Sequence, residues 1–196
     1  MVRQMLDTFD KIYLITCYHS KHRLKNTLSH LKDNGIIPEI FVAPIKHHFS
    51  HAHYYNNFNK RRAIFPGKIS LACAYEQLFQ KCIIDNTQTA LFLEDDVRLK
   101  DDWRRNISQW NIKDWYILKD GAETHFFAMS LQAMRDYLNK YAMSYNCIDW
   151  QINELINCQP NKPSIITTNI ATQGSWLLRT TKSTIDVKED IYTLEF

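Results

Sequence analysis

The sequence predicts a single α/β domain, spanning residues 1–196, around a mainly parallel central sheet. Short apolar, β-prone runs alternate with stretches of helical periodicity, as they do where each strand is followed by a helix. With 45% hydrophobic residues, a chain of this length can bury a core without disulfide or metal staples. The stability of the fold therefore gives no reason to expect a cofactor.

The first half of the chain shows the alternation most clearly. Ser20 is placed to cap the first helix and Gly35 to end it, and the leucines between them recur at helical spacing. The strand at 89–93 is apolar and runs directly into acidic residues. The expected strands are 11–17, 37–42 and 89–93, and the expected helices lie between Ser20 and Gly35 and over 70–85.

The second half continues the pattern with shorter elements. The helix at 131–141 places Leu131, Met134, Leu138 and Tyr141 on one face. We expect strands at 115–118, 125–130 and 164–168, and helices at 131–141 and around 149–156. After Gln173 the pattern fades into a tail that predicts no element.

A histidine-rich segment, residues 44–66, interrupts the alternation. Its histidines, together with two adjacent tyrosines, indicate a long loop over a site, with a polar and aromatic surface for an acceptor. Chelation of zinc is an alternative, although the spacing fits no zinc module. The basic run at 60–62 is interpreted as a solvated face or as an attraction for a phosphorylated acceptor or anionic lipid. The histidines are His47, His48, His51 and His53.

Composition excludes several classes of function. The four glycines are too scattered for a Gly-rich phosphate loop of either standard kind. A net charge of +3 does not fit a protein built around nucleic acid. Five scattered cysteines indicate reduced thiols in the cytoplasm, and the lack of any apolar stretch of about 20 residues leaves at most peripheral contact with a membrane.

The residues Glu94, Asp95 and Asp96 follow the predicted strand at 89–93. Carboxylates so close together raise one another's pKa, and a divalent cation removes that conflict. Their hard oxygens suit Mg²⁺ or Mn²⁺, and ligands bind at the carboxyl ends of strands in open α/β sheets. The alternative is an acidic turn that caps the next segment.

The segment Ala90–Val97, ALFLEDDV, resembles the acidic motif of glycosyltransferase family 25, a variant of the Asp-x-Asp signature of GT-A enzymes. The resemblance covers about residues 11–175. It departs from the family at Ser70-Leu71 and Ala74-Tyr75, where the family has a cysteine and a Ser-His pair, so the sugar specificity is expected to differ. The other similar segments are Lys11–Ile15 with Arg23, Phe65–Ile69, Ala128–Ser130 and Cys147–Asp149.

The resemblance implies a GT-A-like α/β/α sandwich that binds a nucleotide-sugar donor. By this match Asp96 holds Mn²⁺ or Mg²⁺, which acts as a Lewis acid on the departing nucleoside diphosphate. Glu94 or Asp95 would contact the ribose or the donor sugar. Donor contacts are also expected from the end of the first strand and the arginine after it, namely from Thr16, Tyr18 and Arg23.

The family resemblance also implies an inverting reaction, in which a carboxylate takes the proton of the acceptor hydroxyl. Asp149 matches a family aspartate and is the expected base, with Trp150 beside it for a sugar ring. Asp149 equally suits a helix N-cap. Asp120 and Glu123 are the reserve candidates for the base, because they follow a strand that ends at the same edge of the sheet.

Taken together, these expectations describe an inverting, metal-dependent hexosyltransferase. It would move galactose or glucose from a UDP-sugar to a glycan, such as a lipooligosaccharide or another cell-surface or capsid glycan, in the cytoplasm or at the inner face of a membrane. One alternative is a Mg²⁺-dependent nucleotidyltransferase or phosphoesterase, which would need further carboxylates for a second metal. The other is a carbohydrate-binding module without turnover.

Overall fold

The computed structural model describes most of the N-terminal 173 residues. Tyr18, Glu123, the histidines of residues 47–53, the basic run at 60–62 and the tail after Gln173 lie outside the described residues. The described ranges are 6–17, 21–43, 66–110, 114–121, 124–142, 144, 147–167 and 170–173.

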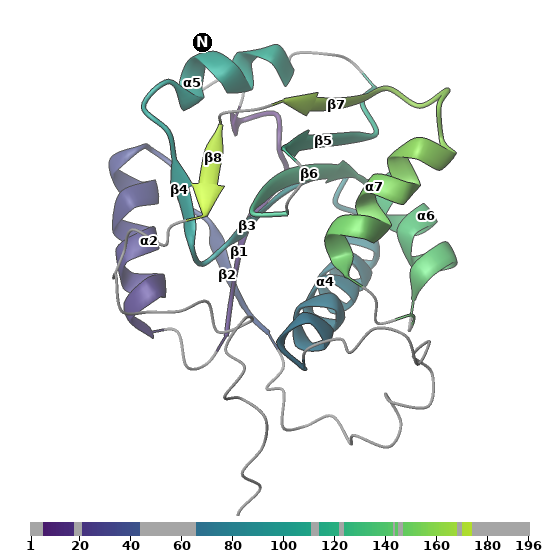
Figure 1. Ribbon diagram of the computed structural model, residues 1–196, viewed down its shortest axis with the longest axis horizontal. Helices are drawn as coiled ribbons and strands as arrows, with labels where there is room; N and C mark the ends of the chain where they lie inside the picture. The colour runs from purple at the N-terminus through teal and green to yellow at the C-terminus, as the bar shows by residue number, and fades with distance from the viewer. Residues whose placement is uncertain are drawn as a thin grey trace, which may run out of the picture.

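A six-stranded sheet forms the centre of the fold, in the order β2-β1-β3-β6-β5-β7 (Figure 1). β1 is parallel to β2 and β3, and β5 is parallel to β7. β6 is antiparallel to both of its neighbours, β3 and β5. The prediction of a mainly parallel α/β sheet is therefore confirmed. The strands are β1 Lys11–Thr16, β2 Glu39–Val42, β3 Thr89–Glu94, β5 Ile117–Asp120, β6 Phe126–Ser130 and β7 Ser164–Thr167.

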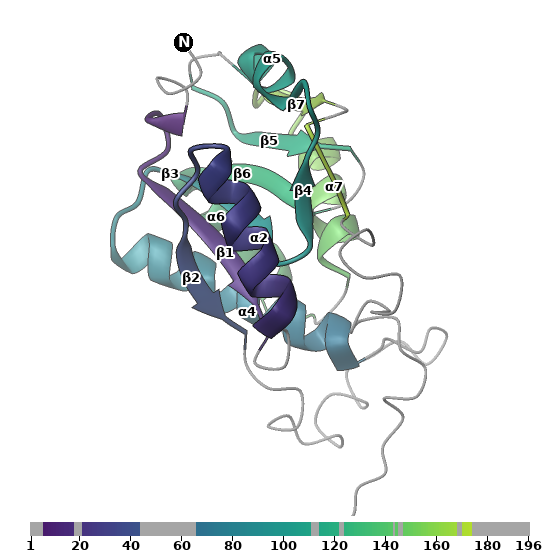
Figure 2. The same cartoon turned by 90° about the vertical axis from the view of Figure 1, so that its left-hand side faces the viewer.

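Helices cover both faces of this sheet, as the two views in Figures 1 and 2 show. The helices α4 (Pro66–Ile84), α6 (Leu131–Tyr141) and α7 (Ile148–Cys158) pack on one face. The helices α2 (Lys21–Asp33) and α5 (Trp103–Ile107) cover the other face, together with the 3-10 helix η2 (Ser108–Trp110). A two-stranded ribbon of β4 (Val97–Leu99) and β8 (Ala171–Gln173) lies with them.

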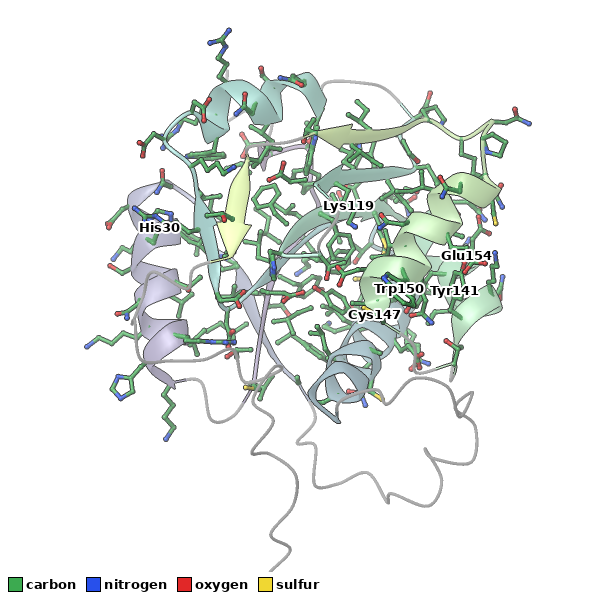
Figure 3. The ribbon with its side chains drawn as sticks, viewed as in Figure 1. His30, Lys119, Tyr141, Cys147, Trp150 and Glu154 are labelled. Atoms are coloured by element: carbon green, nitrogen blue, oxygen red, sulfur yellow. The ribbon has the colours of Figure 1, made fainter. Side chains whose placement is uncertain are left out.

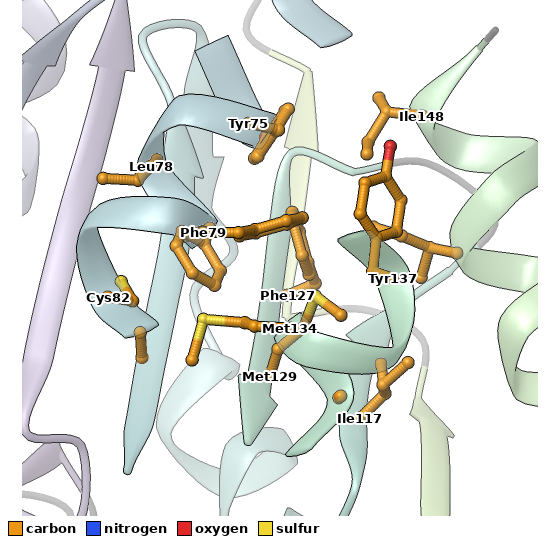
Figure 4. Packing of buried hydrophobic residues seen from close by; sticks show 14 of the residues in the cluster. Tyr75, Leu78, Phe79, Cys82, Ile117, Phe127, Met129, Met134, Tyr137 and Ile148 are labelled. Carbon is orange, nitrogen blue, oxygen red and sulfur yellow. The ribbon is translucent and has the colours of Figure 1, made fainter. Parts of the chain in front are cut away.

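Side-chain alternation along the strands divides the core into two clusters. Phe92 and Phe127 face α4 and α6, where they pack among Tyr75, Phe79 and Tyr137. Figure 4 shows Phe127 beside Tyr75, Phe79 and Tyr137. The intervening residues of the same strands pack on the other face against α2, α5 and β4. This alternation continues past the ends of the strands and decides where the polar residues there point.

Several element boundaries differ from the predicted ones. Helix α4 begins at Pro66, because proline is well tolerated in the first turn, where its missing N–H is not needed. β2 begins only after Pro38, which has no N–H for a sheet ladder. β5 begins at Ile117 rather than at Trp115, whose ring packs against Phe9.

Four short elements, β4, α5, η2 and β8, escaped the sequence analysis. They contain three to five residues each, which is too few for a periodic pattern. Among the described residues, no helix is both long and apolar enough to cross a membrane.

Candidate active site

The carboxyl ends of three parallel strands lie at one edge of the sheet. β1 ends at Thr16, β3 at Glu94 and β5 at Asp120. Because β6 runs the other way, its first residues lie at the same edge, with Leu93 opposite Phe126. This edge is where ligands bind in open α/β sheets, as expected from the sequence.

Asp95 points toward α2. Its carboxylate accepts a hydrogen bond of 2.6 Å from Oγ1 of Thr16 and another from Nη2 of Arg23. The hydroxyl of Thr27 donates to its backbone carbonyl at 2.7 Å. Burial raises the pKa of Asp95, although Arg23 and Thr16 oppose that effect. Both carboxylate oxygens of Asp95 are thus already bonded, which anchors Arg23 at the sheet edge.

Glu94 points to the opposite face, toward α4. Its Oε1 accepts hydrogen bonds from Oγ1 of Thr124 at 2.9 Å and from the hydroxyl of Tyr75 at 3.2 Å. Its Oε2 lies 3.2 Å from Nδ1 of His125. Burial and the charge of Glu94 raise the pKa of Tyr75 well above its usual value, so this phenol remains a hydrogen-bond donor to Glu94.

Asp96 lies between Arg23 and His125. Its Oδ1 is 3.4 Å from Nδ1 of His125, and its Oδ2 is 3.8 Å from Nη1 of Arg23. All three acidic side chains are buried. Arg23 and His125 therefore supply positive charge among three buried carboxylates, which an ordinary solvated acidic turn would not need.

His125 was not predicted as a site residue, because it was taken as the first residue of the strand predicted at 125–130. Burial lowers its pKa, but hydrogen bonds and charges from Asp96 and Glu94 outweigh burial and raise the pKa to about 11. In the absence of metal the ring is therefore a cation that bridges the two carboxylates. A metal ion at this place would have to displace that proton.

The pKa of His125 predicts how the stability of the metal-free protein depends on pH. Because the folded pKa is raised from 6.5 to about 11, the folded state holds the proton more tightly than the unfolded state does. This stabilisation is complete below pH 6.5 and is lost as the pH rises through about 11. We expect the free energy of unfolding, measured with urea in the presence of a chelator, to fall over this range.

The His125→Gln variant should remove most of that fall, since glutamine carries no proton to lose. His22, an exposed histidine of α2, offers a matched control, and His22→Gln should keep the slope of the wild type. An equal slope in the wild type and in His125→Gln would show that His125 is not protonated between the two carboxylates.

One oxygen each of Glu94 and Asp96 and one ring nitrogen of His125 lie within 4.8 Å of one another, a spacing that fits one metal ion. Two hard carboxylates with one imidazole form a donor set that suits Mn²⁺. The structure therefore groups Asp96, the expected metal ligand, with Glu94, which was expected to contact the ribose or the donor sugar, and adds His125 to them.

The two described candidates for the base, Asp149 and Asp120, differ in their surroundings. Asp149 lies in the first turn of α7, but Cys147 is the N-cap, so Asp149 does not cap the helix. Its Oδ1 is buried with no hydrogen-bond partner among the described residues. Its charge also contributes to the raised pKa of Tyr75, which donates to Glu94.

Asp120 makes backbone contacts at the end of β5. Its Oδ2 accepts the N–H of Ile170 at 3.0 Å and that of Ala171 at 2.6 Å. Burial raises the pKa of Asp120, and these two hydrogen bonds oppose that rise. Asp120 thus fixes the start of β8.

Comparison with known proteins assigns the chain to a family. The model of glycosyltransferase family 25, described as an LPS biosynthesis protein, matches residues 9–169. The chain therefore belongs to glycosyltransferase family 25 and is a glycosyltransferase, as the acidic motif after β3 indicated. None of the curated proteins matches the sequence.

Solved structures of glycosyltransferases are similar to this chain at low identity. One is a glycosyltransferase involved in glycosylating the major capsid of PBCV-1, with 10% identity, 81% of each chain covered and a TM-score of 0.44. Another is a nucleotide-diphospho-sugar transferase from Desulfovibrio desulfuricans, with 10% sequence identity. The match covers 81% of this chain and 80% of that one, with a TM-score of 0.44.

A third is a mutant of Drosophila β-1,4-galactosyltransferase 7 in complex with manganese, UDP-Gal and xylobiose. Its sequence is 13% identical, and the match covers 91% of this chain and 77% of that one, with a TM-score of 0.44. The assignment of this chain rests on the family model, and its fold on the strand order and directions described above.

Proposed function

We propose that this chain is an inverting, metal-dependent hexosyltransferase that uses a UDP-sugar, with galactose or glucose as the sugar, and a glycan acceptor such as a lipooligosaccharide. One observation carries the proposal. Glu94, Asp96 and His125 converge at the carboxyl edge of the sheet, in a chain that belongs to a glycosyltransferase family. The reaction would take place in the cytoplasm, with at most peripheral contact with a membrane.

Glu94, Asp96 and His125 would hold the metal. A bound Mn²⁺ or Mg²⁺ would act as a Lewis acid that neutralises charge on the departing nucleoside diphosphate. Tyr75 and Thr124 keep one oxygen of Glu94 fixed, so that the other faces His125. This fixed orientation reduces the cost of arranging the ligands when the metal binds.

Thr16 and Arg23 would form the donor side of the site. The Nε of Arg23 is buried with no hydrogen-bond partner among the described residues, so it remains a donor for a ligand oxygen. Asp95 has both oxygens bonded, and we therefore assign it the role of positioning Arg23 rather than contacting the ribose. Glu94 is assigned to the metal, so we propose that Arg23 makes the direct contact with the donor. Tyr18, which lies outside the described residues, stays a predicted donor contact.

Asp149 would serve as the general base that takes the proton of the acceptor hydroxyl. Oδ1 of Asp149 and Oδ1 of Asp120 are both buried without a hydrogen-bond partner among the described residues. Their other oxygens differ, because Oδ2 of Asp120 accepts two backbone N–H groups whereas Oδ2 of Asp149 has only a long contact of 3.5 Å from the thiol of Cys147, which leaves Asp149 the less constrained carboxylate. Trp150, which follows Asp149 on α7, has 52% of its surface exposed. An exposed indole next to a base is a suitable platform for the apolar face of an acceptor sugar.

The test is donor hydrolysis in the presence and absence of metal. The protein is incubated with a panel of nucleoside diphosphate sugars and Mn²⁺, and the release of nucleoside diphosphate is measured. We expect slow hydrolysis of a UDP-hexose that a chelator stops and added Mn²⁺ restores.

Hydrolysis that continues unchanged in chelator would contradict the metal dependence. Phosphodiester cleavage or nucleotidyl transfer without sugar release would favour the other enzyme class. Thermal stabilisation by glycans without any response to donors would indicate a carbohydrate-binding module.

A further inference from the structure

Lys119 is a charged residue type buried completely within the sheet. It is the third residue of β5, opposite Phe127 in β6, and it has 0% of its surface exposed. Strand alternation puts it on the face of Ile117, which is the face covered by α4, α6 and α7. Lysine is rarely fully buried, because removing its amino group from water is costly. An apolar side chain would fill the same place at lower cost.

The amino group of Lys119 bonds to α7. Its Nζ donates to Oδ1 of Asn153 at 2.9 Å. Other polar contacts of α7 are with α6 instead. Tyr137 donates to Oε1 of Gln151, and Lys140 pairs with Glu154 and donates to Sγ of Cys158. The bond from Lys119 thus links α7 to the sheet itself, close to the strand end where the acidic cluster lies.

Asn153 lies one helical turn after Asp149, so the two residues share a side of α7. Asp149, in the first turn of α7, lies near the candidate site, since its charge contributes to the raised pKa of Tyr75. Figure 3 shows Lys119 within the sheet and Cys147 and Trp150 at the start of α7. A tether at Asn153 therefore sets how far the first turn of α7 stands from the metal-binding edge.

We propose that Lys119 is a positioning residue that holds α7 against β5 through Asn153, and so fixes Asp149 and Trp150 on the acceptor side of the site. This inference rests on the proposed function, in which Asp149 is the base. Lys119 does not touch the substrates. It acts on transfer by holding the base at its distance from the reacting hydroxyl.

The test compares Lys119→Met with the wild type. Methionine matches the lysine side chain as far as Cε but loses the amino group and its bond to Asn153. Asn153 is only partly buried and can bond to water instead, and the cost of burying the lysine amino group is removed. We therefore expect an unchanged or higher Tm. Because small misplacements of a reacting group are costly, kcat for transfer should fall by about 10- to 100-fold with UDP affinity unchanged.

Three further variants make the result specific. Asn153→Leu removes the same bond from the helix side and should reproduce the loss of kcat, which keeps the test valid if Lys119→Met does not fold. When Asp149→Asn is already present, adding Lys119→Met should lower kcat hardly any further, because both changes act through the same base. Lys140→Met removes a lysine that bonds α7 from α6, and it should keep the kcat of the wild type.

Hydrogen exchange separates this proposal from the proposed function. In Lys119→Met the amides of residues 148–153 should exchange faster, while those of α4 should not, whether or not the wild type transfers sugar. Unchanged exchange in residues 148–153 would overturn the positioning role. A kcat of Lys119→Met equal to that of the wild type would also overturn it. So would a double variant whose fold-loss in kcat is the product of the losses of Lys119→Met and Asp149→Asn. A wild type without donor turnover overturns the proposed function alone.

Discussion

The Asp96→Asn variant should lose at least about 10³-fold in kcat, because a metal that stabilises the leaving group contributes several kcal/mol to the transition state. Asparagine keeps the shape of the side chain but cannot supply the charge that holds a divalent cation beside Glu94. Folding should change little. The loss of the contact with His125 is offset by the removal of one of three adjacent buried carboxylates.

The measurement pairs turnover with Mn²⁺ binding and with urea unfolding. Asp85→Asn provides the control, since Asp85 lies at the end of α4 and pairs only at the surface, with Lys81 at 2.5 Å. It should keep both turnover and metal affinity. If Asp96→Asn retained more than a tenth of wild-type turnover and its sensitivity to chelator, Asp96 would not be a metal ligand.

The acidic residues after β3 could be predicted because their signal is local. A run of apolar residues that ends in three carboxylates indicates a strand end with a ligand, and the structure places them at that edge. Their division between two faces follows from strand alternation, which sends Glu94 toward α4 and Asp95 toward α2. The roles of the three acidic residues differ because their neighbours differ.

His125 could not be predicted in the same way, since its place depends on a distant pairing. β6 is inserted antiparallel between β3 and β5, and this pairing puts the residue before Phe126 beside Glu94. The direction of a buried strand leaves no mark on its own apolar sequence. The short ribbon of β4 and β8 escaped prediction for a related reason, because it is stabilised by pairing and by Asp120 rather than by local periodicity.

The burial of Lys119 also could not be predicted from the local sequence. Within the predicted second half, a lysine between Leu118 and Asp120 gives the pattern of a strand that reaches the surface. In the structure this lysine is enclosed, because α7 passes over the end of β5 and supplies Asn153 as its partner. Burial of a polar residue depends on such tertiary contacts, which the local pattern does not contain.

The Asp149→Asn variant should lower kcat for transfer by about 10²- to 10⁴-fold, the usual contribution of a general base, while UDP affinity stays at the wild-type value. An amide cannot take the proton of the acceptor hydroxyl, and Asp149 does not belong to the metal-binding group. Glu154→Gln, a change at an exposed carboxylate of the same helix, should keep full activity. Asp120→Asn should instead lower stability, because Asp120 fixes the start of β8. If Asp120→Asn lost turnover while remaining folded and Asp149→Asn did not, the base would be Asp120, and α7 would serve the acceptor through Trp150 alone.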